Sequence, residues 1–124
     1  MGCKVVLVYP IPEVGWDVVQ TAIAKTRDLT PLEVDAFFSD QTNIATRYAV
    51  FKERTRSAYE VLNSVRNDKN LLRIYPEERF CDGEYCYTYD HALYYRDDDH
   101  LSHPGAVLLY QQILSEIEDK WEEG

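Results

Sequence analysis

The sequence has few basic residues, and this shortage limits what the protein can bind. Lysine and arginine together number 13, against 22 aspartates and glutamates, which gives a formal net charge of −9. Binding to nucleic acid or to an anionic membrane surface requires a basic face, which this balance does not supply. We therefore expect no nucleic-acid partner. The 124 residues contain no internal repeat and suit a single domain.

Long hydrophobic runs are also missing. The longest apolar run near the start is VVLVYPI at residues 5–11, which is too short to cross a bilayer and is interrupted by proline. No small-residue cleavage site follows it, as a signal peptide requires. The opening MGCKVV has Val6 where a myristoylation signal has Ser or Thr. From these residues we expect neither a signal sequence nor a transmembrane segment, and no lipid anchor.

Cysteine is scarce, and the count of three is odd, which argues against a disulfide-rich scaffold. Cys81 and Cys86 bracket the turn-forming residues DGEY. A disulfide there would stabilise the fold by roughly 2 kcal/mol and indicate an oxidising compartment. Free thiols are the alternative. A zinc site would need a second pair of ligands at suitable spacing, and the sequence offers none.

The hydrophobic patterns predict an α/β fold. Residues 4–12 (KVVLVYPIP) and 70–76 (NLLRIYP) are continuous apolar runs ended by proline, typical of strands buried in a parallel sheet. Between them, apolar residues recur every three or four positions from Thr42 to Val65 and predict a long helix. A strand, a helix and a second strand favour parallel pairing through a right-handed crossover. A three-layer arrangement follows, although two strands are few for a covered sheet.

The remaining segments complete the expected organisation. A helix is predicted from Asp17, and residues 29–38 read as a loop or a short helical piece. The tyrosine-rich segment 80–96 is predicted to form a hairpin around Cys81 and Cys86. A final helix is expected from Ser102, which would act as its N-cap, with a proline in the first turn.

Residues 94–106 (YYRDDDHLSHPGA) contain the candidate chemistry. Asp97 precedes His100 by three positions, a spacing at which a carboxylate can orient an imidazole and stabilise its protonated form. Spacing alone fits an exposed acidic turn with a chance histidine better than it fits a catalytic site. A metal site at Asp97, Asp99, His100 and His103 is not expected, because the glycine and distal glutamate of a calcium loop are missing. His91 has no evident role.

Three stretches carry a resemblance to a known family: KVVLVYPIPEVGWDV, FCDGEYC and LYYRDDDHLSHPGA. In their order and separation they resemble the C-terminal part of the SGNH-type domain attached to membrane acyltransferases that O-acetylate bacterial surface polysaccharides, lipopolysaccharide among them. The resemblance spans nearly all of residues 1–124. It implies a partial three-layer, flavodoxin-like SGNH fold with parallel strands whose N-terminal half is missing.

The resemblance assigns roles to individual residues. Asp97 would be the orienting acid and His100 the general base of a Ser–His–Asp triad, while Cys81 and Cys86 match the family's disulfide. It implies no cofactor and no metal. None of the serines lies in the family's Gly-Asp-Ser context, so the nucleophile and the oxyanion-hole blocks are expected outside this chain. The chain alone is therefore expected to be inactive.

The implied setting is the periplasmic side of a bacterial inner membrane, downstream of a membrane acyltransferase domain, with an acyl donor and a glycan acceptor as substrates. An exposed sheet edge would favour an edge-paired or domain-swapped homodimer. The alternative function is a non-catalytic acidic module that binds glycans through stacked tyrosines. The candidates for that surface are Tyr75, Tyr85, Tyr87, Tyr89, Tyr94 and Tyr95.

Overall fold

A computed structural model describes residues 2–121 of the chain. No helix within this range is both long and apolar enough to cross a membrane. In chain order the elements are β1 (Val5–Val8), α1 (Val18–Thr26), α2 (Pro31–Ser39), the 3₁₀ helix η1 (Gln41–Ile44), β2 (Thr46–Arg47), α3 (Tyr48–Asn63), β3 (Leu71–Ile74), α4 (Glu77–Phe80), β4 (Tyr85–Cys86) and α5 (His103–Trp121).

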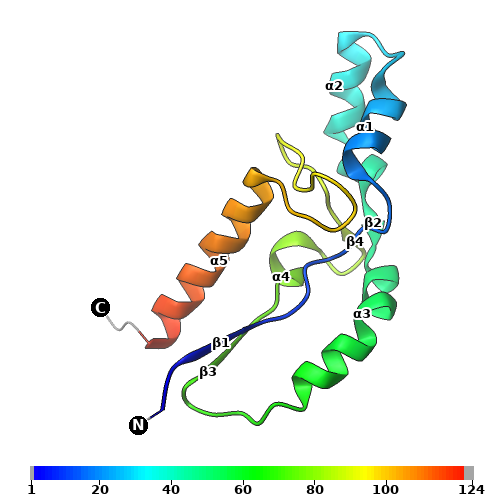
Figure 1. Cartoon of the computed structure of the whole chain (residues 1–124). Helices are drawn as coiled ribbons and strands as arrows, with labels where there is room; N and C mark the ends of the chain where they lie inside the picture. Colours follow the sequence, from blue (N-terminus) through cyan, green and yellow to red (C-terminus); the bar gives the residue numbers. More distant parts are fainter. Residues whose placement is uncertain (1, 122–124) are drawn as a thin grey trace.

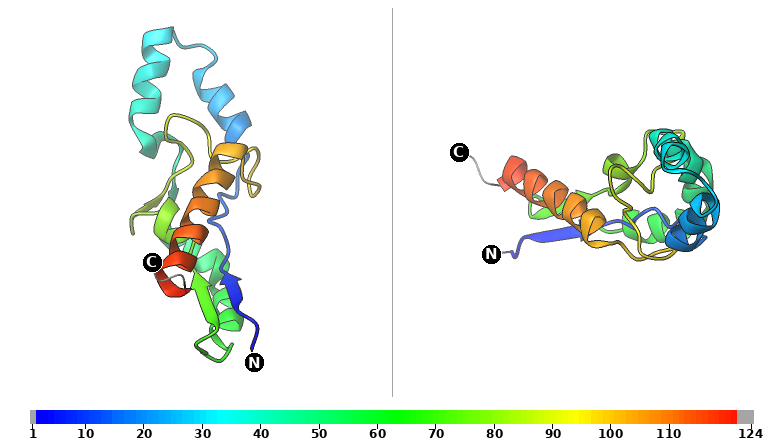
Figure 2. Two further views of the ribbon diagram at one scale, coloured as in Figure 1. Left: turned by 90° about the vertical axis from the view of Figure 1, so that its left-hand side faces the viewer. Right: turned by 90° about the horizontal axis from the view of Figure 1, so that it is seen from above.

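The central feature is a parallel pair of strands covered by helices. β1 and β3 pair in parallel, with Val5 opposite Leu71 and Val8 opposite Ile74. Helices α3 and α5 lie on opposite sides of this pair, as Figures 1 and 2 show from three directions. Both predicted strands and their parallel pairing are confirmed, and so is the α/β class.

Polar side chains join the helices to the strands. The Tyr9 hydroxyl, directly after β1, donates to Asn63 at the end of α3 over 2.7 Å. Arg73 in β3 donates to the Tyr9 hydroxyl over 2.6 Å. On the other side, the Gln112 amide in α5 donates to the Tyr75 carbonyl over 3.0 Å. These hydrogen bonds fix both helices against the ends of the two strands.

The outer edge of β1 is free of a neighbouring strand in the described part of the chain. Val5 and Tyr9 donate their N–H groups toward β3, over 2.7 and 2.8 Å. Because backbone groups alternate in direction along a strand, those of Val6 and Val8 point the other way. The Val8 residue is 40% exposed. This outer edge is open to pairing.

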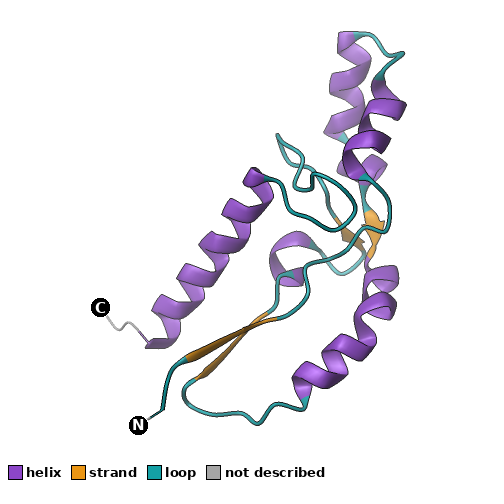
Figure 3. Ribbon diagram, viewed as in Figure 1, coloured by secondary structure: helices purple, strands orange, loops and turns teal. Residues whose placement is uncertain are grey.

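The long helix begins later than the sequence pattern predicts, and its predicted start at Thr42 is wrong. The Asp40 carboxylate accepts a hydrogen bond from the Thr42 N–H over 3.1 Å and caps η1 instead. β2 follows, with Thr46 opposite Cys86 in antiparallel pairing. Figure 3 shows this small sheet lying apart from β1 and β3. Periodicity could not reveal it, because the pairing partner lies about forty residues downstream.

Two further segments differ in detail from the predictions. Residues 31–39 form a regular helix, because Thr30 and Glu33 make a reciprocal capping box at its start. The expected hairpin over 80–96 is wrong: Cys81 and Cys86 share a single bridge, and β4 pairs with β2 instead. The helix predicted from Asp17 is confirmed, with the Asp17 carboxylate accepting from the Gln20 N–H.

Candidate functional site

The segment YYRDDDH folds into a compact loop closed by its own backbone. Tyr95 and Leu101 form an isolated antiparallel bridge, and the Arg96 N–H donates to the His100 carbonyl over 2.9 Å. Inside the loop, Asp97 Oδ1 accepts hydrogen bonds from the N–H groups of Asp99 at 3.0 Å and His100 at 2.7 Å. An aspartate that accepts from the N–H two residues on is a standard turn former. The loop therefore fixes the Asp97 carboxylate.

The second carboxylate oxygen of Asp97 faces the imidazole. Asp97 Oδ2 lies 2.9 Å from His100 Nδ1. Asp99 Oδ1 lies at the same distance from the same nitrogen as an ion-pair partner, so two carboxylates face one side of the ring. The His100 side chain is 61% exposed, and no hydrogen bond to its Nε2 occurs within residues 2–121. Nε2 is thus available to a group from outside this part of the chain.

The electrostatics of Asp97 keep it ionised. Hydrogen bonds from the backbone N–H groups of Asp99 and His100, followed by the imidazole contact, lower the pKa of Asp97 from 3.8 to about 2. A folded-state pKa below the unfolded one means that ionisation stabilises the loop above about pH 4. That stabilisation is lost as the pH falls toward 2. At neutral and mildly acidic pH the imidazole therefore faces a charged acceptor.

The two most distant motifs of the sequence meet at this loop. The Val14 N–H donates to the Asp98 carbonyl over 3.0 Å, and the Val18 N–H donates to the Asp97 carbonyl over 3.3 Å. The segment that follows β1 thus holds the acidic loop from behind. Asp98, which had no predicted role, contributes only through its backbone carbonyl among the contacts within the described chain.

A hydrophobic cluster supports the loop. It consists of Val14, Val18, Phe80, Tyr94 and Tyr95, all buried. The Tyr95 hydroxyl is satisfied by the Pro12 carbonyl at 2.6 Å. Burial removes the phenolate from water and raises the pKa of Tyr95. This tyrosine is therefore a structural element beneath the site and not a reacting group.

Ser102 is a cap and not a nucleophile, as predicted. Its Oγ donates to the Leu93 carbonyl over 2.6 Å and accepts from the Gly105 N–H over 3.2 Å. Its carbonyl accepts the first helical bond, from the Ala106 N–H. Among the described residues, no serine hydroxyl contacts His100. The described part of the chain thus holds an oriented imidazole with no serine hydroxyl beside it.

Gly105 is a residue whose importance the sequence patterns did not reveal. A Cβ built at this position would lie 2.2 Å from the carbonyl oxygen of Tyr94. That same carbonyl accepts a hydrogen bond from the Ser102 N–H. Only glycine allows the first turn of α5 to approach the backbone of the acidic loop so closely.

The donor atoms of Asp97, Asp99 and His100 lie within 4.8 Å of one another, a separation at which a metal ion could be held. His103 does not join this group, although the four-residue site weighed from the sequence included it. Exposed acidic clusters are common in proteins, and one imidazole nitrogen between two carboxylates is also the arrangement of an oriented base. No metal is proposed here.

Cys81 and Cys86 form a disulfide, as predicted. It closes the turn between α4 and β4, and Cys81 packs against the cluster beneath the acidic loop. The remaining thiol, Cys3, is exposed.

The six candidate tyrosines do not form one stacking surface. Tyr94 and Tyr95 are 6% and 1% exposed, and their rings pack against Phe80. The Tyr75 ring lies 4.5 Å from that of Tyr9. The sugar-binding surface considered from the sequence is therefore wrong as a whole, and Tyr89 is considered separately below.

Comparison with known protein families shows which family the chain belongs to. The sequence model described as "SGNH domain (fused to AT3 domains)" matches residues 1–115. The chain belongs to this family. No curated protein and no solved structure matches the chain.

Membership in the SGNH family supports a hydrolase or acyltransferase type of function. The family's fusion to AT3 domains fits an upstream acyltransferase domain and a membrane-associated protein. The loop that contains Asp97 and His100 lies within the matched residues. The family match therefore covers the whole of the geometry described above.

Proposed function

We propose that the chain is the C-terminal portion of one SGNH-type domain and supplies the Asp–His pair of a Ser–His–Asp triad. The complete domain would transfer or hydrolyse acyl groups of a bacterial cell-surface polysaccharide, on the periplasmic side of the inner membrane. The observation that carries this proposal is the Asp97–His100 pair. One carboxylate oxygen is fixed by two backbone N–H groups, the other lies 2.9 Å from Nδ1, and Nε2 is open.

The proposed mechanism follows from which nitrogen is bonded. With the proton of Nδ1 directed at Asp97, Nε2 is the basic nitrogen and removes the proton from a serine hydroxyl. The serine oxygen then bonds to the acyl carbonyl carbon, and His100 returns the proton to the departing alkoxide. A sugar hydroxyl repeats the sequence in the second half: Nε2 takes its proton, its oxygen bonds to the acyl carbon, and the serine leaves with the proton.

The serine and the oxyanion-hole donors are proposed to come from another part of the domain. Within the described residues, the serine hydroxyls that form hydrogen bonds use carbonyls of their own neighbourhood: Ser39 bonds to Ala36, Ser64 to Val61 and Ser102 to Leu93. Without a serine at Nε2, the covalent route is closed to this chain alone.

The isolated chain is expected not to hydrolyse p-nitrophenyl acetate faster than free imidazole at equal concentration, because it lacks the nucleophile. The measurement compares release of p-nitrophenol by the chain and by His100→Ala at matched concentrations. The two should give the same rate. Turnover by the chain that His100→Ala abolishes would show that a nucleophile is present within these 124 residues.

We further propose that the isolated chain forms a homodimer through β1. The outward N–H and C=O groups of Val6 and Val8 offer the same unpaired ladder on each copy, so antiparallel pairing about a two-fold axis satisfies both copies. Light scattering at about 100 µM is expected to give twice the mass of one chain. Val6→Pro removes an outward N–H without touching the bonds to β3 and should give a monomer. A monomer for the unsubstituted chain would contradict this prediction.

A further inference from the structure

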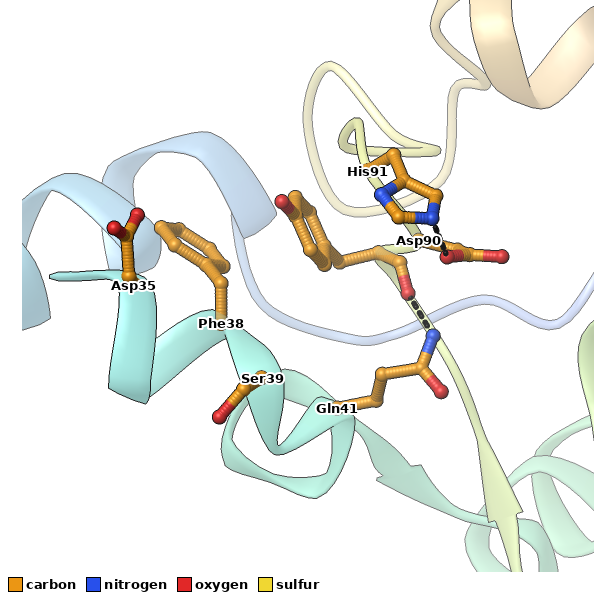
Figure 4. A pocket seen from close by; sticks show the side chains of 7 residues that line it. Asp35, Phe38, Ser39, Gln41, Asp90 and His91 are labelled. Carbon is orange, nitrogen blue, oxygen red and sulfur yellow. Dashed lines mark hydrogen bonds and ion pairs between the residues drawn. The ribbon is translucent and has the colours of Figure 1, made fainter.

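A second concave site lies away from the acidic loop, beside the turn at residues 89–92. It is a cavity of about 400 Å³ between the end of α2, the start of η1 and this turn. Figure 4 shows its lining side chains. The volume is within the range of small-ligand pockets, roughly 300–1,000 Å³. Nothing in the proposed triad mechanism uses this cavity.

The apolar part of the cavity is an aromatic pair held in place. The Phe38 and Tyr89 rings lie 4.6 Å apart at an interplanar angle of 32°. The Gln41 amide donates to the Tyr89 carbonyl over 2.6 Å, which ties the start of η1 to the turn. Tyr89 is also bridged to Leu93 across the turn. The two rings therefore come from separate segments that are fastened to each other.

Polar groups surround the aromatic pair. Asp35, Ser39 and Gln41 line the cavity from the helical side, and Asp90 and His91 line it from the turn. Figure 4 shows the Asp35 carboxylate beside the Phe38 ring and the Asp90 carboxylate paired with His91 on the turn. Carboxylates are the strongest acceptors for ligand hydroxyls. The site thus combines an apolar platform with hydrogen-bond acceptors on two sides of it.

The backbone at the turn has an uncommon conformation. His91 has a φ of 63°, a conformation that is uncommon outside glycine and asparagine and costs about 1 kcal/mol or more. The Asp90 N–H donates to the Ala92 carbonyl over 3.1 Å, which closes the turn around His91. The His91 imidazole in turn contacts the Asp90 carboxylate at 3.4 Å. The turn therefore places both residues at the exposed rim of the cavity.

We infer that this cavity is a subsite for a neutral sugar residue of the glycan. A pyranose ring presents C–H groups on its faces and hydroxyls around its rim, which matches rings flanked by carboxylate, amide and hydroxyl groups. Two carboxylates in a chain of net charge −9 disfavour an anionic sugar or a phosphate. The inference rests on the proposed function, because the glycan is the acyl acceptor or donor there.

The test is a titration of the ¹⁵N-labelled chain, followed by NMR, with three neutral tetrasaccharides: maltotetraose, cellotetraose and chitotetraose. At least one is expected to shift the amide signals of Phe38, Gln41, Tyr89 and His91 with a millimolar dissociation constant, unchanged in 0.5 M NaCl. Tetragalacturonate is the anionic comparison and should bind more weakly. No shift with any neutral probe, or tighter binding of tetragalacturonate, would overturn the inference.

Substitutions test whether the glycan binds at this cavity or at other exposed aromatic residues. Phe38→Ala and Asp90→Ala are each expected to weaken binding about tenfold, through loss of stacking and of a charged acceptor respectively. Asp90 is on the surface, so its replacement tests the site even where Phe38→Ala lowers stability. Tyr110→Ala is the matched control, since Tyr110 is 62% exposed on α5; its affinity should not change. Equal affinities for Asp90→Ala and Tyr110→Ala would contradict the inference.

The result is distinguishable from a failure of the proposed function, because binding requires neither a serine nor acyl transfer. His100-dependent transfer in a complete domain together with no glycan binding at Phe38 would overturn the subsite alone. Glycan binding without His100-dependent transfer would support the subsite and remove the triad.

Discussion

Replacing His100 with alanine in a complete SGNH domain is expected to lower acyl transfer by about 10⁶-fold, the loss seen when a triad base is removed. The effect should fall on kcat, because the imidazole moves protons in the transition state and binds no remote part of the substrate. The measurement is transfer from a small acyl ester by the domain assembled with its serine-bearing part. His103→Ala is the matched control. His103 is exposed at the start of α5, and its variant should keep activity within about twofold. A loss of less than tenfold for His100→Ala would remove the triad proposal.

Two substitutions of Asp97 separate its proposed role in orienting the imidazole from its role in holding the loop together. Asparagine at this position keeps an Oδ1 that can accept from the N–H groups of Asp99 and His100. It also turns an NH₂ toward Nδ1, which removes one acceptor of the ring proton and favours the tautomer protonated at Nε2, the wrong nitrogen for a base. Asp97→Asn should therefore retain the loop and lose activity, whereas Asp97→Ala should lose both.

Because the Asp99 carboxylate also lies at Nδ1, the effect of replacing Asp97 should depend on whether Asp99 is present. With Asp99 Oδ1 still 2.9 Å from Nδ1, Asp97→Asn is expected to lose about tenfold to a hundredfold. The double variant with Asp99→Asn should lose about 10⁴-fold. Imidazole ¹⁵N shifts report the tautomer in each variant. Additive effects of the two substitutions would show that Asp99 does not take over the contact with Nδ1 when Asp97 is replaced.

The elements with strong local signals were predictable from the sequence, and so was the proximity of the Asp97 and His100 side chains. The β1 and β3 strands are continuous apolar runs, and α5 has a serine cap and a regular apolar face. The long helix was extended too far, because the same apolar spacing continues through η1 and β2, where Asp40 and the pairing with β4 determine the backbone. Long-range pairing leaves no periodic trace in one strand.

Within the site, the sequence could not show in which direction the side chains point. The spacing of Asp97 and His100 suggested a contact, but three consecutive aspartates look alike in sequence. The turn distinguishes them: it directs Asp97 and Asp99 to the same nitrogen and uses the carbonyl of Asp98 to hold the segment after β1. The separation of the two motifs by some eighty residues likewise hid that they hydrogen-bond to each other.

Gly105→Ala is expected to destabilise the fold by about 2 kcal/mol, an unusual result for an alanine in a helix. Alanine gains up to about 1 kcal/mol over glycine from helix propensity. The added Cβ would lie 2.2 Å from the Tyr94 carbonyl oxygen. That neighbour is backbone held by the Ser102 N–H, so relief requires moving α5 or the acidic loop. Such overpacking costs about 3 kcal/mol, and the clash therefore outweighs the propensity.

The Gly105→Ala prediction is checked by urea unfolding of the chain and by the amide signals of residues 94–102. Ser115→Ala, an exposed substitution to the same residue on the same helix, is the control and should change the free energy of unfolding by less than about 0.5 kcal/mol. Because Tyr94 leads directly into the acidic loop, the variant should also shift the signals of Asp97 and His100. A Gly105→Ala chain as stable as Ser115→Ala would mean that α5 does not contact the loop as closely as described. The position of His100 would then not depend on this glycine.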